Sequence, residues 1–233
     1  MNYDALRDQV WKANMDLVKS GLVILTWGNA RRIDEKREVM AIKPSGVDYA
    51  SMKAEDIVIV SLETGKTVGG DLNPSSDTPT HLELYQAFDT IRGIVHTHSM
   101  YATAWAQAAK PIPCYGTTHA DHFFGPVPVT RQLTADEIET GYEKHSGTVI
   151  VEYFRNKNID PAHVPAALLP HHGPFAWGKT PEAAVKNAVA LEAVAQMALF
   201  TEEVDADAVE TPAVQLNKHF MRKHGPGAYY GQK

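Results

Sequence analysis

Residues 93–99 read Gly-Ile-Val-His-Thr-His-Ser, an apolar β-prone run that ends in two histidines. In a strand, residues two apart point to the same face of the sheet, so His96 and His98 can bind one ion from one side. Imidazole is a ligand for several first-row transition metals. The stretch therefore predicts a strand over 91–97 with a metal site at its end. For an isolated His-x-His, two solvated polar side chains are the alternative.

A third histidine follows the apolar run Leu168-Leu169-Pro170. His172 is succeeded by Gly173, which leaves room for a ligand to approach. Three protein nitrogens with an open position are the arrangement of a catalytic metal site. His171 points elsewhere in an extended chain and is interpreted as an outer or surface residue. The pattern assigns no role to His81, His163, His219 and His224.

Asp77 has two interpretations. It lies in Pro74-Ser75-Ser76-Asp77-Thr78-Pro79, where a capping side chain and a proline in the first turn predict a helix start. The same carboxylate is also a candidate fourth ligand, or a negative charge beside the metal. Spacing alone leaves both interpretations open.

Three short turns resemble parts of an anion site. Residues 26–29 (Thr-Trp-Gly-Asn), 43–46 (Lys-Pro-Ser-Gly) and 74–76 (Pro-Ser-Ser) each offer hydroxyls or free backbone N–H groups. Lys43 adds a charge, and the third turn opens a helix whose N-terminal dipole favours phosphate. Each turn alone is a weak signal.

The remaining pattern predicts one α/β or α+β domain over residues 1–233. Helices are expected over 3–20, from 77 onward, over 102–109, over 181–200 and after 212. Strands are expected over 22–27, 39–42, 57–62, 91–97, 149–154 and 166–169, with a loop-rich stretch over 114–128.

The composition limits the classes of partner and cofactor that we expect. The formal charge is −6, from 22 basic and 28 acidic residues, with no basic stripe of the kind that binds nucleic acid. The single cysteine, Cys114, excludes an intrachain disulfide and suits a reducing compartment. No segment is expected to approach the ~18 apolar residues of a membrane span. Gly225-Pro226-Gly227 has the wrong spacing for a nicotinamide loop. These features predict a cytoplasmic protein with neither a membrane nor a nucleic-acid partner.

Taken together, the motifs resemble the class II aldolase and epimerase family, and within it the L-ribulose-5-phosphate 4-epimerases, over nearly the whole chain. The stretches that carry the resemblance are 25–29 (LTWGN), 42–49 (IKPSGVDY), 74–81 (PSSDTPTH), 93–99 (GIVHTHS), 116–121 (GTTHAD), 172–179 (HGPFAWGK), 222–225 (RKHG) and 228–232 (AYYGQ).

The resemblance implies a three-layer α/β/α sandwich around a mainly antiparallel sheet, assembled as a ring-shaped homotetramer. It implies Zn²⁺, or another divalent ion such as Mn²⁺ or Co²⁺, on His96, His98 and His172, with Asp77 close by. It also implies an acid–base pair, Asp121 and Tyr230, that reaches the site from a neighbouring subunit. The implied substrate contacts are Gly28, Asn29, Lys43, Ser45, Gly46, Ser75 and Ser76, with lesser roles for Thr117 and Glu143.

The implied activity is interconversion of L-ribulose 5-phosphate and D-xylulose 5-phosphate, as in arabinose or ascorbate catabolism. The C4 hydrogen is one carbon too far from the C2 ketone to be acidic. Without a nicotinamide, inversion at C4 therefore requires cleavage and re-formation of the C3–C4 bond.

Sister activities are the alternatives. An L-fuculose-phosphate aldolase is the nearest, although those relatives carry a glutamate where this chain has Asp77. A dehydratase is a further one. Non-catalytic relatives that serve as binding modules in the membrane skeleton lack the histidines, and a purely structural metal is not needed for a core of this size.

Two positions depart from the family pattern. A serine usually follows two residues after the Gly-Asn turn, but here Arg31 and Arg32 follow, which either disturbs the phosphate loop or adds to anion binding. His171 stands where serine is common.

Overall fold

Seven strands form one sheet in the computed structural model, which describes residues 3–231; Gln232, part of the C-terminal motif, lies outside the described residues. The strand order is β4-β3-β2-β1-β5-β7-β6, and every pair is antiparallel. The strands are β1 (Gly28–Ile33), β2 (Val39–Ile42), β3 (Val58–Ser61), β4 (Thr67–Gly69), β5 (Gly93–Thr97), β6 (Ala166–Leu169) and β7 (Gly173–Gly178).

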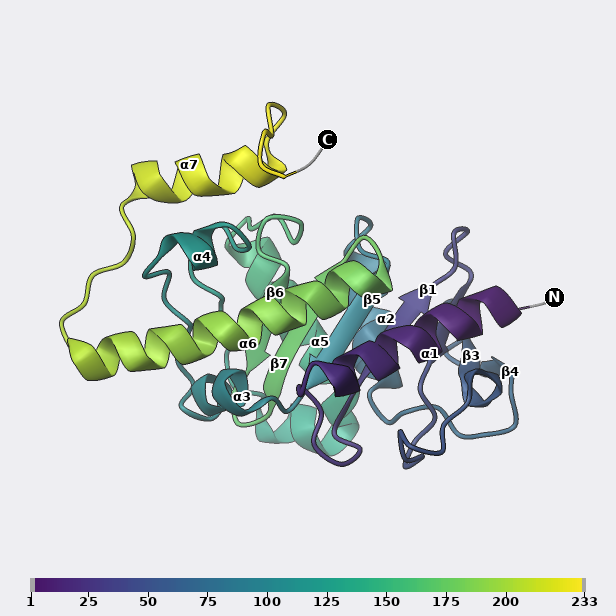
Figure 1. Cartoon of the computed structure of the whole chain (residues 1–233). Helices are drawn as coiled ribbons and strands as arrows, with labels where there is room; N and C mark the ends of the chain where they lie inside the picture. The colour runs from purple at the N-terminus through teal and green to yellow at the C-terminus, as the bar shows by residue number, and fades with distance from the viewer. Residues whose placement is uncertain (1–2, 232–233) are drawn as a thin grey trace.

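Helices cover both faces of this sheet. They are α1 (Asp4–Lys19), α2 (Thr78–Ala87), α3 (Met100–Gln107), α4 (Thr117–Ala120), α5 (Ala135–Asn156), α6 (Pro181–Val204) and α7 (Ala213–His224), with one 3₁₀ turn, η1 (Ala54–Asp56). Figure 1 shows α1 and α6 in front of the sheet and α5 behind it.

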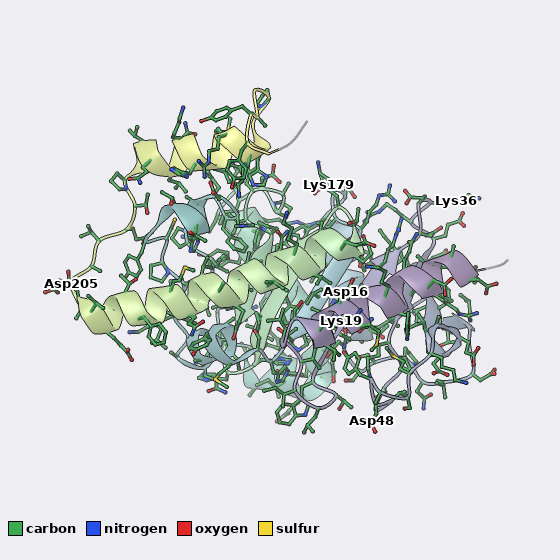
Figure 2. All side chains as sticks on the ribbon, viewed as in Figure 1. Asp16, Lys19, Lys36, Asp48, Lys179 and Asp205 are labelled. Carbon is green, nitrogen blue, oxygen red and sulfur yellow. The ribbon has the colours of Figure 1, made fainter. Side chains whose placement is uncertain are left out.

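The alternation of strand side chains divides the core between these two faces. Val95 of β5 packs in one cluster with Leu191 and Val194 of α6. Its neighbour Ile94 packs in the other, with Leu84 of α2 and Phe154 of α5. The expected three-layer α/β/α sandwich is confirmed. Charged side chains such as the labelled Lys36, Asp48 and Asp205 lie at the outside (Figure 2).

The C-terminal helix stands apart from the sandwich. An extended segment leads from the end of α6 to α7, which packs against α4 rather than against the sheet (Figure 1). Only Phe220 of α7 is fully buried. Helix α4 in turn contacts α6, so α7 is joined to the sandwich through α4, and we call this pair the α4–α7 projection.

Two expected strands are wrong. Residues 22–27 form a tight turn in which the Trp27 N–H donates to Ile24 O at 3.0 Å, Leu25 has φ 55°, and β1 begins only at Gly28. Residues 149–154 lie inside α5, because Thr134 and Glu137 form a capping box upstream, and Val149, Ile150 and Phe154 bury one helical face. Tertiary burial there outweighs the β propensity of the side chains.

Several other expectations hold with small shifts. The strands over 39–42 and 166–169 have the expected bounds, and α3 begins two residues earlier than expected. Strands β4 and β7 were not expected. Within residues 3–231, α6 is the one helix long and apolar enough to cross a membrane, so the expectation that no segment approaches that limit is wrong. Its apolar character comes from the face that packs on β5 and β7.

Candidate metal centre

Three histidines converge at one end of the central strands. One potential ligand atom from each of His96, His98 and His172 lies within 4.8 Å of the others. The Nε2 atoms of His96 and His98 are 3.1 Å apart. The β5–β7 pairing and the turn before β7 bring His172 to the pair, because His96 lies opposite Phe175 in the sheet. The structure thus joins two motifs that are far apart in the sequence.

The outer nitrogens of two rings are held by the protein. His96 Nδ1 lies 2.9 Å from Pro174 O, so this nitrogen carries the proton and Nε2 keeps its lone pair. His172 Nδ1 lies 2.9 Å from Tyr142 Oη, which leaves its Nε2 for the centre. Metal-binding histidines are oriented in this way. The donor set therefore fits a divalent transition metal.

The surroundings of the three imidazoles favour their neutral form. Burial lowers the pKa of His96 to about 3, and burial also lowers the pKa of His98 and of His172. A metal binds the neutral imidazole, so protons compete weakly for the site at neutral pH.

Asp77 is close to the triad but is not one of the grouped ligands. Its Oδ2 accepts from Asn29 Nδ2 at 3.0 Å and from Ser75 Oγ at 3.3 Å. Its side chain makes no capping bond, so the expected helix cap is wrong, although Asp77 is the N-cap residue. Burial alone would raise the pKa of this carboxyl, but His96, Arg31 and the Asn29 hydrogen bond lower it below its usual value.

A cavity of about 350 Å³ lies over the triad, and all three predicted anion turns line it. Gly28 has φ 117°, and a Cβ there would meet His96 O at 2.8 Å, so only glycine fits this approach of β1 to β5. The lining residues are Thr26, Trp27, Gly28, Asn29, Lys43, Pro44, Ser45, Gly46, Ser75, Ser76, Asp77, His96, His98, Tyr142, Glu143 and His172.

The second and third turns are tied together. Ser45 N–H donates to Asn73 O at 2.9 Å and Ser75 N–H to Lys43 O at 3.1 Å. The backbone N–H groups of Gly46 and Ser76 donate to no acceptor within residues 3–231, so they remain for a ligand. Lys43 is buried, its ammonium donates to Val47 O at 2.5 Å, and burial lowers its pKa. The cavity can therefore receive an anionic group beside the histidines.

Tyr142 is a site residue that the sequence did not suggest. It follows Gly141, where the backbone of α5 leaves helical geometry, and this kink turns Tyr142 and Glu143 to the cavity. The Gly141-Tyr142 pair is the local signal that could have pointed to it, but no helix was expected over this stretch.

Asp121, Tyr230 and Thr117 lie outside the lining of this cavity, on or beside the α4–α7 projection. Arg222 Nη2 donates to Asp121 Oδ2 at 2.7 Å, and the Arg222 guanidinium also lies 4.7 Å from the centroid of the Tyr230 ring. Burial would raise the pKa of Asp121, but bonds from Arg222 and His219 lower it. One chain therefore holds two separate polar clusters. His219, given no role from the sequence, belongs to the second.

The two residues that depart from the family pattern, Arg31 and His171, lie in different environments. Arg31 is fully buried and does not line the cavity, so it adds no direct anion contact. His171 is exposed, has φ 59°, and its Nε2 lies 2.9 Å from Gln132 Nε2, as fits a surface residue.

Solved structures with the same fold include enzymes of sugar-phosphate chemistry. An L-fuculose 1-phosphate aldolase is 26% identical, with a TM-score of 0.78 over 94% of this chain and 96% of its own. The L-fuculose-1-phosphate aldolase of Thermus thermophilus is 25% identical, with a TM-score of 0.66 over 87% and 97%. YgbL of Klebsiella pneumoniae, at 22% identity and a TM-score of 0.71 over 94% and 99%, shows the fold alone.

The sequence itself identifies the family. Residues 8–199 match the family described as the class II aldolase and adducin N-terminal domain. That range contains the sheet, both helical layers and the three histidines. This chain therefore belongs to the class II aldolase and adducin N-terminal domain family.

Proposed function

We propose that this protein is a divalent-metal-dependent epimerase that interconverts L-ribulose 5-phosphate and D-xylulose 5-phosphate. The observation that carries the proposal is one cavity that joins the three histidines to the turns at Gly28, Lys43 and Ser75. A phosphorylated ketose needs both kinds of group, because its phosphate and its carbonyl end lie at opposite ends of a small molecule.

In this proposal, the three turns bind the phosphate. The free N–H groups of Gly46 and Ser76 and the start of α2 supply donors and a favourable dipole. His96, His98 and His172 hold the metal, for which we propose Zn²⁺, Mn²⁺ or Co²⁺. When bound, such a metal supplies Lewis acidity to the substrate's carbonyl and hydroxyl oxygens.

The proposed reaction cleaves and re-forms one bond. A base removes the proton from the C4 hydroxyl, the C3–C4 bond breaks, and its electron pair passes to the dihydroxyacetone fragment as an enediolate. Glycolaldehyde phosphate then turns its other face, and re-addition returns the proton to the C4 oxygen. We propose that Asp121 and Tyr230 of a neighbouring subunit in a homotetramer transfer this proton. One of them acts on the C4 oxygen of L-ribulose 5-phosphate and the other on the C4 oxygen of D-xylulose 5-phosphate.

The support for a neighbouring subunit is the separation within one chain. Asp121 and Tyr230 share the α4–α7 projection, and neither lines the cavity over the histidines. A second copy that offers its projection would complete the site. We also propose that the enzyme acts in the cytoplasm, in pentose catabolism.

An aldolase of the L-fuculose-phosphate type is the second candidate. The 26% identical solved structure named as that aldolase favours it. Against it stand Asp77 in place of the implied glutamate and the C-terminal motif around Tyr230. One assay separates them: L-ribulose 5-phosphate and L-fuculose 1-phosphate are supplied in turn, with and without chelator. Chelator-sensitive formation of D-xylulose 5-phosphate supports the epimerase. Release of two fragments from L-fuculose 1-phosphate alone supports the aldolase.

A further inference from the structure

Helix α3 begins directly after one of the three histidines. His98 follows the end of β5, Ser99 is the N-cap residue, and the helix runs from Met100 to Gln107. Ser99 makes no side-chain capping bond within the described part of the chain, although its carbonyl accepts from Thr103 N–H at 2.9 Å. The first N–H groups of a helix have no partner inside that helix, so those of α3 need an acceptor from elsewhere.

Glu192 of α6 supplies this acceptor. Its two carboxylate oxygens accept from the backbone N–H groups of Tyr101 and Ala102, at 2.8 and 2.9 Å. The positive end of the helix dipole favours a carboxylate at this place, and hydrogen bonds to a charged acceptor are stronger than those between neutral groups. Glu192 therefore fixes the first turn of α3 on α6.

Two side-chain bonds hold α3 on the same neighbour along its length. Trp105 Nε1 donates to Ala195 O at 3.0 Å, and Gln196 Nε2 donates to Tyr101 Oη at 2.9 Å. Helix α6 itself packs on β5 and β7, the two strands beside the metal centre (Figure 1). The position of α3 relative to the sheet is thus set through α6.

The far end of α3 reaches the segment of another histidine. Ala106 O, in its last turn, accepts from His171 N–H at 3.0 Å, directly before His172. Thr103 lies against the same segment, since a Cβ on Gly173 would lie 3.6 Å from Thr103 Oγ1. One short helix therefore joins two of the three histidine segments, which are far apart in the sequence.

We propose that Glu192 is a positioning residue, which fixes α3 on α6 and thereby sets the separation of His98 from His172 in the metal site. Glu192 does not line the cavity, so it acts on the histidines through the backbone of α3. A metal ion requires its ligand atoms at defined distances and angles, so a shift of either segment weakens binding. This inference rests on the metal part of the proposed function and is independent of the epimerase activity.

Cobalt(II) is the probe for the test. Metal-free wild type, Glu192→Ala and Glu192→Gln are titrated with Co²⁺ against a competing chelator, at a temperature at which each is folded, and the visible absorption of each complex is recorded. Glu192→Ala loses both bonds, so we expect its Co²⁺ affinity to fall roughly 10-fold, at the lower end of the range for groups that orient metal ligands. Its absorption bands should shift as the ligand geometry changes. Glu192→Gln keeps one acceptor oxygen and should lie between Glu192→Ala and wild type.

Thr180→Ala is the matched control, which separates positioning from stability. Thr180 Oγ1 accepts from Ala183 N–H at 3.1 Å and caps α6, beyond Gly178 at the opposite end of β7 from His172. Because both substitutions remove acceptors from the start of a helix, both should lower the urea midpoint of unfolding. Thr180→Ala should nevertheless keep the Co²⁺ affinity and spectrum of wild type.

The inference is overturned if folded Glu192→Ala binds Co²⁺ with the affinity and spectrum of wild type, or if Thr180→Ala weakens binding as much. If Glu192→Ala does not fold, Glu192→Gln decides, and a wild-type affinity and spectrum in that variant would overturn the inference. Wild type that binds no Co²⁺ would instead overturn the proposed function and this inference with it.

Discussion

Tyr142 Oη lies 2.9 Å from His172 Nδ1, and the two rings stack at a centroid distance of 5.9 Å. The hydroxyl lies where it accepts the Nδ1 proton, so His172 Nε2 keeps its lone pair for a metal. The kink at Gly141 of α5 thus positions the partner of His172, the one triad histidine that lies in the turn before β7.

Tyr142→Phe should therefore weaken metal binding without unfolding the chain. Loss of a partner of this kind costs roughly 10- to 100-fold in metal affinity. The measurement is competitive Zn²⁺ titration of the metal-free protein. Tyr153→Phe, which removes the hydroxyl of another α5 tyrosine packed against the core, is the control and should bind as wild type does. Equal affinities for both variants would contradict the assignment.

Removal of a triad member should abolish turnover and leave the fold. His98→Ala is expected to lose both the bound ion and activity, since two histidines hold a divalent ion poorly. Circular dichroism should remain that of wild type, because His98 lies beyond the end of β5. The exposed His163→Ala is the matched control. Full activity in chelator-treated protein would end the metal hypothesis.

The stability of the metal-free protein should decrease in acid. Unfolded histidine titrates near pH 6.5, whereas burial lowers the pKa of folded His96 to about 3. Between these values the unfolded chain binds a proton that the folded chain does not. The free energy of unfolding should then fall with pH from about 6.5 downward, by at most about 1.4 kcal/mol per pH unit for each such histidine.

Urea unfolding at several pH values measures this slope. His96→Phe removes the titrating group and keeps an aromatic ring beside Phe175, which stacks on His96 at 4.3 Å. Its slope should be smaller by up to one proton. Identical slopes for the two proteins would show that His96 is not the source.

Two inactive variants should rescue each other if the site is shared between subunits. His98→Ala and Tyr230→Phe are mixed, unfolded and reassembled, and the hybrids are assayed. Some sites then combine an intact histidine cluster with an intact Tyr230. Activity should reappear in hybrids and be absent from either parent. The neighbouring Tyr229→Phe is expected to be active on its own. Inactive hybrids of verified composition would favour a site within one chain.

Carbon–carbon cleavage has an isotopic signature. The proposed route breaks the C3–C4 bond, so heavy-atom isotope effects are expected at both C3 and C4. Dihydroxyacetone and glycolaldehyde phosphate, supplied together, should slowly yield L-ribulose 5-phosphate and D-xylulose 5-phosphate. An effect confined to C4, or a requirement for added nicotinamide, would rule this mechanism out.

Local sequence predicted several of the residues that line the cavity. The His-x-His pair on one face of β5, the glycine at 28 and the hydroxyl turns are short-range features, in which a few adjacent residues specify both geometry and chemistry. Strand propensity failed at 22–27, where Ile24, Leu25 and Trp27 stay exposed and Trp27 lines the cavity. It failed again at 149–154, where burial of one helical face decided the outcome.

The tertiary structure decided which site residues contact one another. The sequence by itself determined the three histidines, the anion turns and the alternation that makes a layered α/β fold. Only the tertiary structure brought Tyr142 to His172, bonded the Asp77 carboxylate to Asn29 rather than to the N–H groups of α2, and buried Arg31 away from the cavity lining. The first two of these relationships join residues that are 30 and 48 positions apart, through strand register and helix packing. No local pattern encodes such distances, because burial and pairing across the whole core select them.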